Sequence, residues 1–447
     1  HRNTEILYNR KQLRIKVARK SSKNWTFQMN QMLINSTNHH GDEEAGQRNQ
    51  IHSHQLYGRT MFSDICRFIF VTLPLLLFSL LRLFLFVVCL LPGFLRFAWY
   101  YFIASDRVSL NYGSESFRQR VDVYRSCKQT GSQREGLPGR EFNDSIEEYS
   151  SNAPVIVFCT GGAWMIGYKM WGALLARAVT AAGIVVVIPD MRNYPMVYIP
   201  DMVDDVDLAI NWTFENIAQY GGDPTNIVVV GQSAGGHVAC MAIFRNIKRK
   251  ISRESAVAAA KELVGTEREE GLKRILEDDE KLNEGWSVSN LKGFAAISSP
   301  LSLGSPILAQ SFRRQGFNDK MVHRMFGFKK DMYDPYLALQ NFPSVEEKEK
   351  FLKELPPIAI YQGTEDKTVP LEVAETFYRE LSQIVLDENS VSFVPYIGWS
   401  HTDPILEGPM DADHRLHKDL FDNVNKWTTS PNLSWPNDHP SVNGRLC

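Results

Sequence analysis

A serine inside a short glycine-flanked motif is the residue best placed for nucleophilic chemistry. The pentapeptide GQSAG at Gly231–Gly235 follows an apolar run at Ile227–Val230 and precedes helix-forming residues. A sharp turn from strand to helix needs small residues two positions either side of Ser233, because larger side chains would collide there. Such a turn places the hydroxyl at the positive end of the following helix. The context predicts a nucleophilic serine, although the motif alone also fits an ordinary tight turn.

A serine hydroxyl is a weak nucleophile and needs a general base. Where this motif carries a catalytic triad, an acid and then a histidine follow the serine along the chain. His401 comes directly after a predicted strand at Val391–Tyr396 and meets that order. His237 lies four residues after Ser233 on the same helix, where packing or capping is expected, and His323 precedes any plausible acid. We therefore predict His401 as the base, with a surface-loop histidine as the alternative.

The acid of such a triad is expected at the end of the strand that precedes the histidine. The predicted strand Ile358–Tyr361 leads into a polar loop that contains Asp366. A carboxylate there would orient the imidazole of His401 and stabilise its protonated form. Glu365 is the competing acid, because the turn decides which side chain faces the histidine. We predict Asp366.

The negative charge that develops on the substrate needs backbone N–H donors. The sequence TGGAW at Thr160–Trp164 follows the predicted strand Val155–Cys159. Glycines allow a close approach of the backbone, and the N–H after the nucleophile is expected to join them. Oxyanion and substrate binding is therefore assigned to five residues: Gly161, Gly162, Ala163, Gln232 and Ala234.

Short apolar runs alternate with stretches of helical periodicity from about residue 105 onward. The helical stretches include Met202–Tyr220 and Leu371–Ile384. Continuous apolar strands separated by helices indicate a mostly parallel sheet with helices on both faces. With the motif order, this predicts an α/β-hydrolase fold over residues 105–447. The predicted strands are Val155–Cys159, Ile184–Ile188, Ile227–Val230, Phe294–Ile297, Ile358–Tyr361 and Val391–Tyr396.

A densely charged stretch at 246–290 interrupts this alternation. It is expected to be a helical surface insertion, because charge runs usually mark a solvated face. A role as a substrate lid is the alternative.

The N-terminal part has two regions of opposite character. Residues 1–60 are polar and are expected to be disordered. Residues 61–104 are predicted to form a hydrophobic membrane segment, in which Phe68–Leu91 has nineteen Leu, Phe, Ile or Val among 24 residues and one charge, Arg82. A helix of that length reaches about 36 Å and can cross a ~30 Å hydrocarbon core. A re-entrant or interfacial hairpin is the alternative. Because the sequence begins at His1 rather than Met, we expect the natural chain to start earlier.

Composition gives no reason to expect a nucleic-acid partner or a metal site. Lys and Arg number 49 against 51 Asp and Glu, a net charge of −2. The six cysteines form no CxxC pair and no Cys/His ligand spacing. A serine hydrolase of the predicted kind also needs no cofactor.

The motifs together resemble one branch of the α/β hydrolases. TGGAW, GGDPTNIVVVGQSAGGH, GTEDKTVP and SHTDPI resemble the hormone-sensitive-lipase-like enzymes and, more narrowly, the isoprenylcysteine methylesterases of plants. The resemblance covers roughly 109–422, except the charged insertion. It implies catalytic roles for Ser233, Asp366 and His401 and substrate-binding roles for Gly161, Gly162, Ala163 and Ala234.

The same resemblance implies an integral membrane enzyme of the endoplasmic reticulum or Golgi that hydrolyses the methyl ester of a C-terminal prenylated cysteine. Trp164, Met165, Trp171 and Tyr194 are candidates to line an apolar pocket for the prenyl group, with ordinary core residues as the alternative. A general carboxylesterase or lipid deacylase, and a catalytically silent receptor or scaffold, are the rival functions.

Overall fold

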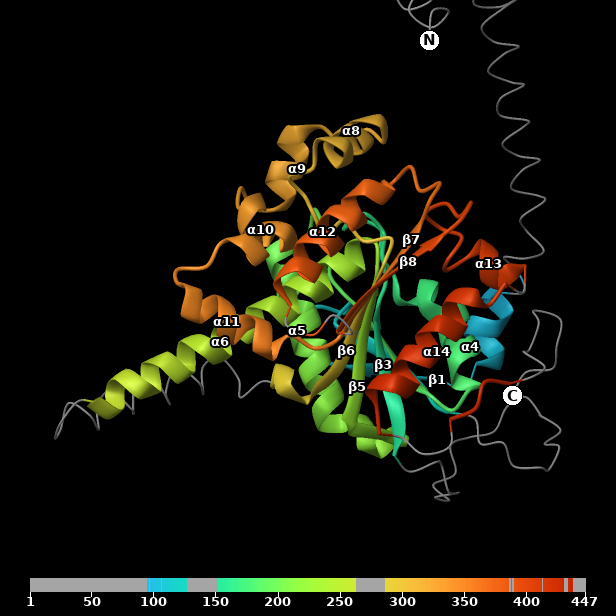
Figure 1. Cartoon of the computed structure of the whole chain (residues 1–447). Helices are drawn as coiled ribbons and strands as arrows, with labels where there is room; N and C mark the ends of the chain where they lie inside the picture. Colours follow the sequence, from blue (N-terminus) through green and yellow to red (C-terminus); the bar gives the residue numbers. More distant parts are fainter. Residues whose placement is uncertain are drawn as a thin grey trace, which may run out of the picture. The chain divides into compact units, whose positions relative to one another are not determined.

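The computed structural model describes residues 95, 97–105, 107–126, 152–262, 286–385, 387, 390–411, 413–429 and 433–436. All of them belong to one unit that spans Leu91–Cys447 (Figure 1). The predicted polar region 1–60 and the predicted membrane helix 68–91 lie outside the described residues. Within the described ranges, no helix is both long enough and apolar enough to cross a bilayer.

An eight-stranded sheet forms the centre of the fold, with strand order β1-β2-β4-β3-β5-β6-β7-β8. The six strands from β3 to β8 pair in parallel, whereas β1 and β2 are antiparallel to their neighbours. This is the mostly parallel sheet of an α/β-hydrolase fold, as predicted. The strands are β1 (Arg107–Asn111), β2 (Arg120–Tyr124), β3 (Ala153–Cys159), β4 (Val185–Asp190), β5 (Gly222–Gln232), β6 (Leu291–Ile297), β7 (Ile358–Gly363) and β8 (Val391–Tyr396).

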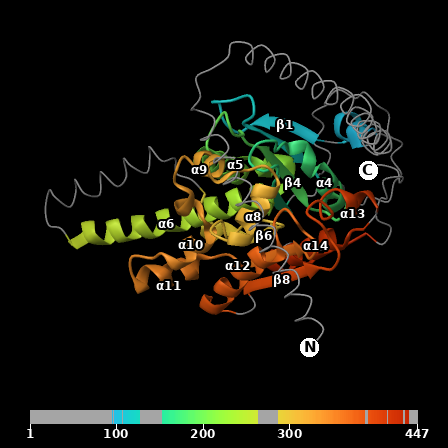
Figure 2. The ribbon, with the colours of Figure 1, turned by 90° about the horizontal axis from the view of Figure 1, so that it is seen from above.

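Helices cover both faces of the sheet, and alternate residues of each strand point into two separate cores. In β3, Val155 and Val157 pack with α5 and α6, while Ile156 and Phe158 pack with α4 and α14. Figure 2 shows the two groups of helices on opposite sides of the sheet. The fully buried strands explain why the sequence showed continuous apolar runs without alternation. The flanking helices are α4 (Ala173–Thr180), α5 (Ile199–Asn216), α6 (Ala234–Glu262), α12 (Leu371–Ile384) and α14 (Arg415–Trp427).

The longest described connection runs from β6 to β7 and contains four α-helices that the apolar pattern did not single out. We call its first part, residues 306–333, the cap segment. Side chains fix where the helices begin: Ser305, Asn318, Asp334 and Ser344 each accept a hydrogen bond from an N–H of the first turn. The helices are α8 (Pro306–Arg314), α9 (Asp319–Met325), α10 (Pro335–Gln340) and α11 (Val345–Glu354); a last short helix, α13 (Glu407–Met410), precedes α14.

The charged stretch expected as a surface insertion starts inside α6. Ile247 and Ile251 are buried in the core, so this part of the helix belongs to the body of the domain. Residues 252–256 are exposed, and 263–285 lie outside the described residues. A helical conformation is therefore observed only as far as Glu262.

Candidate active site

Ser233 occupies the tight turn between β5 and α6 and has a left-handed backbone, with φ 53°. The neighbouring glycines are required by space. A Cβ on Gly231 would lie 2.4 Å from Cα of Gly236, and one on Gly235 would lie 2.3 Å from the carbonyl oxygen of Cys159. Such contacts do not occur in real structures, so any larger residue would open the turn. The backbone holds the serine side chain at the carboxyl end of β5.

The three side chains selected from the sequence meet at this edge of the sheet. His401 Nε2 lies 2.9 Å from Ser233 Oγ, and His401 Nδ1 lies 2.7 Å from Asp366 Oδ2. Because an ionised carboxylate only accepts hydrogen bonds, Nδ1 carries the proton, and Nε2 is left to accept the serine hydroxyl proton. The arrangement can therefore deprotonate Ser233 while it attacks an electrophile.

Asp366 is held rigidly, and its side chain is completely buried. One carboxylate oxygen accepts the backbone N–H groups of Thr368 and Val369, each at 2.8 Å. Glu365, the alternative acid, is exposed, and its backbone N–H donates to the carbonyl of Trp399. The turn thus directs Asp366, and not Glu365, toward the imidazole.

Gln362 is a member of this site that the sequence reasoning did not identify. It is fully buried at the end of β7, and its Nε2 donates to Asp366 Oδ2 at 3.0 Å and to the carbonyl of Val369 at 2.9 Å. Its Oε1 has no hydrogen-bond partner within the described residues. Leaving a buried amide oxygen unpaired costs free energy. The amide is nevertheless oriented with its N–H groups toward the Asp366 carboxylate, so it acts as a hydrogen-bond donor to that group. No sequence signal distinguishes Gln362 from a core residue, because it lies at the end of the buried strand β7, before the loop that carries Asp366.

The loop after β3 lies against the serine turn, as the motif TGGAW suggested. A Cβ on Gly161 would fall 2.8 Å from Cβ of Ser233 and 2.1 Å from Oε1 of Gln232. Gly162 and Ala163 have φ values of 129° and 50°, a conformation that turns the backbone sharply. The N–H of Ala234 is the first of α6, where the N–H groups have no acceptor within the helix. Gly161 thus lies against Ser233, Gln232 and Ala234 flank it along the chain, and Gly162 and Ala163 continue the same loop.

His237 fastens this loop to the nucleophile helix. The indole Nε1 of Trp164 donates to His237 Nδ1 at 3.3 Å, and His237 Nε2 donates to the carbonyl of Tyr333 at 2.7 Å. Complete burial lowers the pKa of His237 to about 4, so the ring is neutral at pH 7. The expected packing role of His237 is confirmed: it joins the loop, α6 and the cap segment. His323 lies on α9 with an exposed side chain.

A second set of contacts fixes the far end of the same loop. The carbonyl of Gly167 accepts hydrogen bonds from Arg118 Nη2 and, at 2.9 Å, from Asn193 Nδ2. Arg118 also pairs with Asp190 at 2.7 Å. Burial nevertheless raises the pKa of Asp190 to about 7. Trp164 and Gly167 are therefore both held by buried polar side chains, which restricts movement of the loop.

The aromatic residues proposed for a substrate pocket have different positions. Trp164 is buried and packs edge-on against Phe312 and Phe326, so it is a core residue. Trp171 is exposed, with its indole 3.5 Å from the carbonyl of Ile166. Met165 and Tyr194 are only partly buried against the core. Of the four, Trp171 is the one exposed to solvent.

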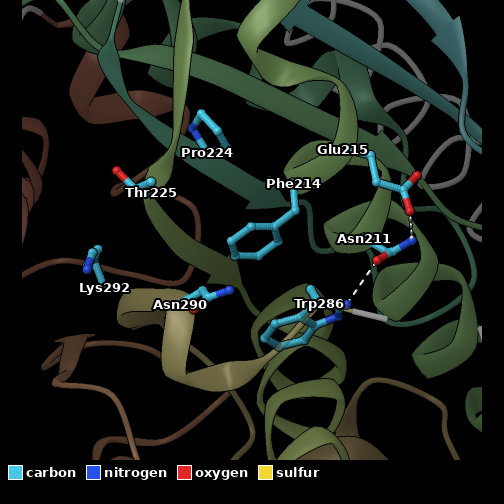
Figure 3. A pocket seen from close by; sticks show the side chains of 8 residues that line it. All are labelled: Asn211, Phe214, Glu215, Pro224, Thr225, Trp286, Asn290 and Lys292. Atoms are coloured by element: carbon cyan, nitrogen blue, oxygen red, sulfur yellow. Dashed lines mark hydrogen bonds between the residues drawn. The ribbon is translucent and has the colours of Figure 1, made fainter. Parts of the chain in front are cut away.

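A hollow of about 440 Å³ lies elsewhere, at the amino ends of β5 and β6 (Figure 3). Its centre is formed by Phe214 and Trp286, whose rings stack with centroids 6.0 Å apart. Ser233 follows the carboxyl end of β5, so this hollow is at the opposite end of the strands and is not part of the triad site. The lining residues are Asn211, Phe214, Glu215, Pro224, Thr225, Trp286, Asn290 and Lys292.

Comparisons with known proteins bear on this site. A family model described as BD-FAE matches residues 146–266. The isoprenylcysteine alpha-carbonyl methylesterase of Arabidopsis thaliana is 31% identical over 77% of this chain and 67% of its own length. A probable isoprenylcysteine alpha-carbonyl methylesterase of Oryza sativa subsp. japonica is 31% identical over 74% of this chain and 67% of its own length. A solved esterase from Thermogutta terrifontis with bound propionate is 19% identical, covers 73% of this chain and 97% of its own, and has a TM-score of 0.47.

Proposed function

This chain belongs to the isoprenylcysteine alpha-carbonyl methylesterase family, and we propose that it hydrolyses the methyl ester of C-terminal prenylated cysteine. It is a carboxylic ester hydrolase with the α/β-hydrolase fold. The observation that carries the proposal is the contact of His401 with both Ser233 and Asp366, at 2.9 Å and 2.7 Å. We assign these three residues as the catalytic triad.

The proposed reaction has two steps. Ser233 Oγ attacks the ester carbonyl while His401 Nε2 takes the hydroxyl proton, and the carbonyl oxygen becomes an oxyanion. The carbon–methoxy bond then breaks, and the methoxy group leaves as methanol with the proton from His401. Water attacks the resulting serine ester and gives its proton to His401, and collapse returns that proton to Ser233 and releases the prenylcysteine acid.

The oxyanion would be held by backbone donors on two elements. The loop supplies N–H groups from Gly161, Gly162 and Ala163, and α6 supplies that of Ala234. Such donors stabilise a charge that exists only during the reaction and need no reorganisation, because the loop is anchored at Trp164 and Gly167. Gln232, whose side chain lies against Gly161, is assigned to substrate binding.

Membrane attachment belongs to this proposal as well. The 24-residue apolar segment Phe68–Leu91 would place the enzyme on the bilayer that also holds the prenyl group of its substrate. Residence in the endoplasmic reticulum or Golgi is proposed from the resemblance alone.

Product analysis on N-acetyl-S-farnesylcysteine methyl ester tests the function. We expect the wild-type chain to release methanol and the free acid, and Ser233→Ala to release neither, while Ser382→Ala on α12 keeps full activity. Parallel assays with p-nitrophenyl butyrate and tributyrin separate the rivals. A higher kcat/KM on either of these than on the prenyl ester would make the protein a general carboxylesterase or lipid deacylase. If a fluorophosphonate probe failed to label wild type, a silent scaffold would be the better assignment.

A further inference from the structure

Exposed apolar side chains are concentrated around the catalytic edge of the sheet. The described residues include fourteen exposed large hydrophobic side chains. Eight lie on connections that follow parallel strands, and Phe117 lies on the β1–β2 turn, which the pairing of Arg120 with Asp190 places at the same edge as the triad. Four more lie between residues 95 and 103. The remaining one, Val345, lies at the start of α11. We call the nine residues the apolar rim: Phe117, Ile166, Trp171, Met196, Tyr198, Ile307, Phe328, Met332 and Ile397.

The rim residues project outward from several separate loops. Ile166, Phe328 and Ile397 retain between 72% and 77% of their accessible surface, so each side chain is directed into solvent. Tyr198 and the turn before Phe328 lie close together, since a Cβ on Gly327 would fall 3.9 Å from Tyr198 Cγ. Exposed apolar side chains on several loops of one edge provide a surface to which an apolar partner can bind. Exposed apolar side chains on separate loops can insert into a deformable apolar phase without a matching rigid surface.

The segment from Leu95 to Ile103, which follows the predicted membrane helix in the sequence, also exposes apolar side chains. One side of it is buried, where Tyr101 donates to Asp122 in the core at 2.7 Å. The other side exposes four apolar side chains: Leu95, Trp99, Phe102 and Ile103. The apolar sequence that ends at Leu91 stops only four residues before Leu95. Aromatic residues next to such a segment are typical of the membrane–water interface.

The charge of the cap segment indicates which kind of surface would be bound. Residues 306–333 contain six Lys or Arg and two Asp, a local charge of +4 in a chain whose net charge is −2. Arg314, Lys320, Arg324 and Lys329 are exposed in this segment, beside the rim residues Phe328 and Met332. Basic residues interspersed with exposed apolar ones bind anionic lipid headgroups and the acyl chains beneath them.

We propose that the apolar rim and the exposed side of residues 95–103 seat the catalytic edge on an anionic bilayer surface. This docking rests on the proposed function, because a prenylated substrate is the reason why the catalytic edge would face lipid. A prenylated cysteine ester lies with its prenyl chain in the bilayer and its carboxyl end at the interface. Docking by this edge places Ser233 at the depth where the ester is found.

A pair of positions with equal exposure provides the test. Phe328 and Val345 both retain 74% of their accessible surface, but only Phe328 belongs to the rim. The full chain would carry an environment-sensitive NBD fluorophore on Phe328→Cys or on Val345→Cys. The background would have Ala at the four cysteines that lie outside the described residues: Cys66, Cys89, Cys127 and Cys447. Each protein is reconstituted into phosphatidylcholine vesicles with brominated acyl chains, with and without phosphatidylserine.

We expect the label at position 328 to be quenched roughly threefold more than the label at 345, and more in vesicles that contain phosphatidylserine. Equal quenching at the two positions would overturn the proposal. So would emission at 328 that depends on protein concentration and not on bromine, because that result identifies a second copy as the partner.

Kinetics supply an independent arm. Phe328→Asp should raise KM for the farnesyl ester in vesicles roughly tenfold and leave KM for dissolved p-nitrophenyl butyrate unchanged, while Val345→Asp changes neither. An equal effect on both substrates would contradict docking. The quenching measurement uses no substrate, so it tests docking separately from the proposed function. Equal quenching with an active prenyl esterase would refute docking alone. Stronger quenching at position 328 in an enzyme that prefers another ester would refute the proposed substrate alone.

Discussion

The buried His237 makes a quantitative prediction about stability and pH. Its ring bridges Trp164 and Tyr333, and burial lowers its pKa from 6.5 to about 4. The unfolded chain therefore binds a proton at this residue between those two pH values when the folded chain does not. Unfolding is favoured as the pH falls through this window, so the stabilisation is complete above pH 6.5 and is lost progressively toward pH 4.

The size of the effect follows from the width of the window. Each pH unit between the two pKa values changes the free energy of unfolding by 1.36 kcal/mol. Lowering the pH from 7 to 4.5 crosses two of these units and should cost about 3 kcal/mol through His237 alone. Asp190 acts in the opposite direction, because its raised pKa of about 7 makes the folded chain bind a proton that the unfolded chain releases. The total pH dependence therefore mixes both groups, and a variant is needed to separate them.

His237→Gln isolates the histidine. A glutamine amide can accept the indole N–H of Trp164 and donate to the carbonyl of Tyr333, but it does not titrate at these pH values. Urea unfolding in detergent solution, followed by tryptophan fluorescence at pH 7 and pH 4.5, would be measured for both proteins. The wild-type chain should lose about 3 kcal/mol more than the variant on acidification. Parallel losses would show that the ring is accessible to protons in the folded state and would refute the reasoning.

Two further substitutions test the triad and the oxyanion loop. Asp366→Asn should lower kcat roughly 10⁴-fold with the fold retained, because the amide favours the wrong tautomer of His401, whereas Glu365→Gln should be nearly silent; the opposite ranking in ester hydrolysis would exchange the two acids. Gly161→Ala should lower kcat by about 10²- to 10³-fold by pushing the loop off the serine turn. The control Gly316→Ala, whose added Cβ meets nothing within 4 Å, should cost only stability, and equal kcat values for the two alanine variants would argue against a preformed loop.

Much of the architecture could be predicted because the parallel strands are buried on both faces. β8 and α12 have the predicted bounds, and the other predicted strands differ only at their ends. β1 and β2 were not predicted: each has five residues, several of them charged or polar, and pairs antiparallel at the edge. The helices between β6 and β7 were also missed, since their short amphipathic stretches are set by capping side chains and by packing against the core. Strands and helices held by polar contacts at the edge of the fold show a weaker hydrophobic pattern in the sequence than completely buried strands do.

The residue types of the triad and their order along the chain came from local motifs, because a strand, a tight turn and a helix constrain neighbouring residues. The choice of Asp366 over Glu365 depended on which side chain the turn after β7 directs inward, and motif order alone could not settle it. Gln362, His237 and Arg118 support the site from positions that are distant along the chain or look like core residues. Sequence determined the chemistry, since reactive groups and glycine turns are local properties. Only the tertiary structure decided the supporting contacts and the apolar rim, because both depend on which distant segments the sheet brings to one edge.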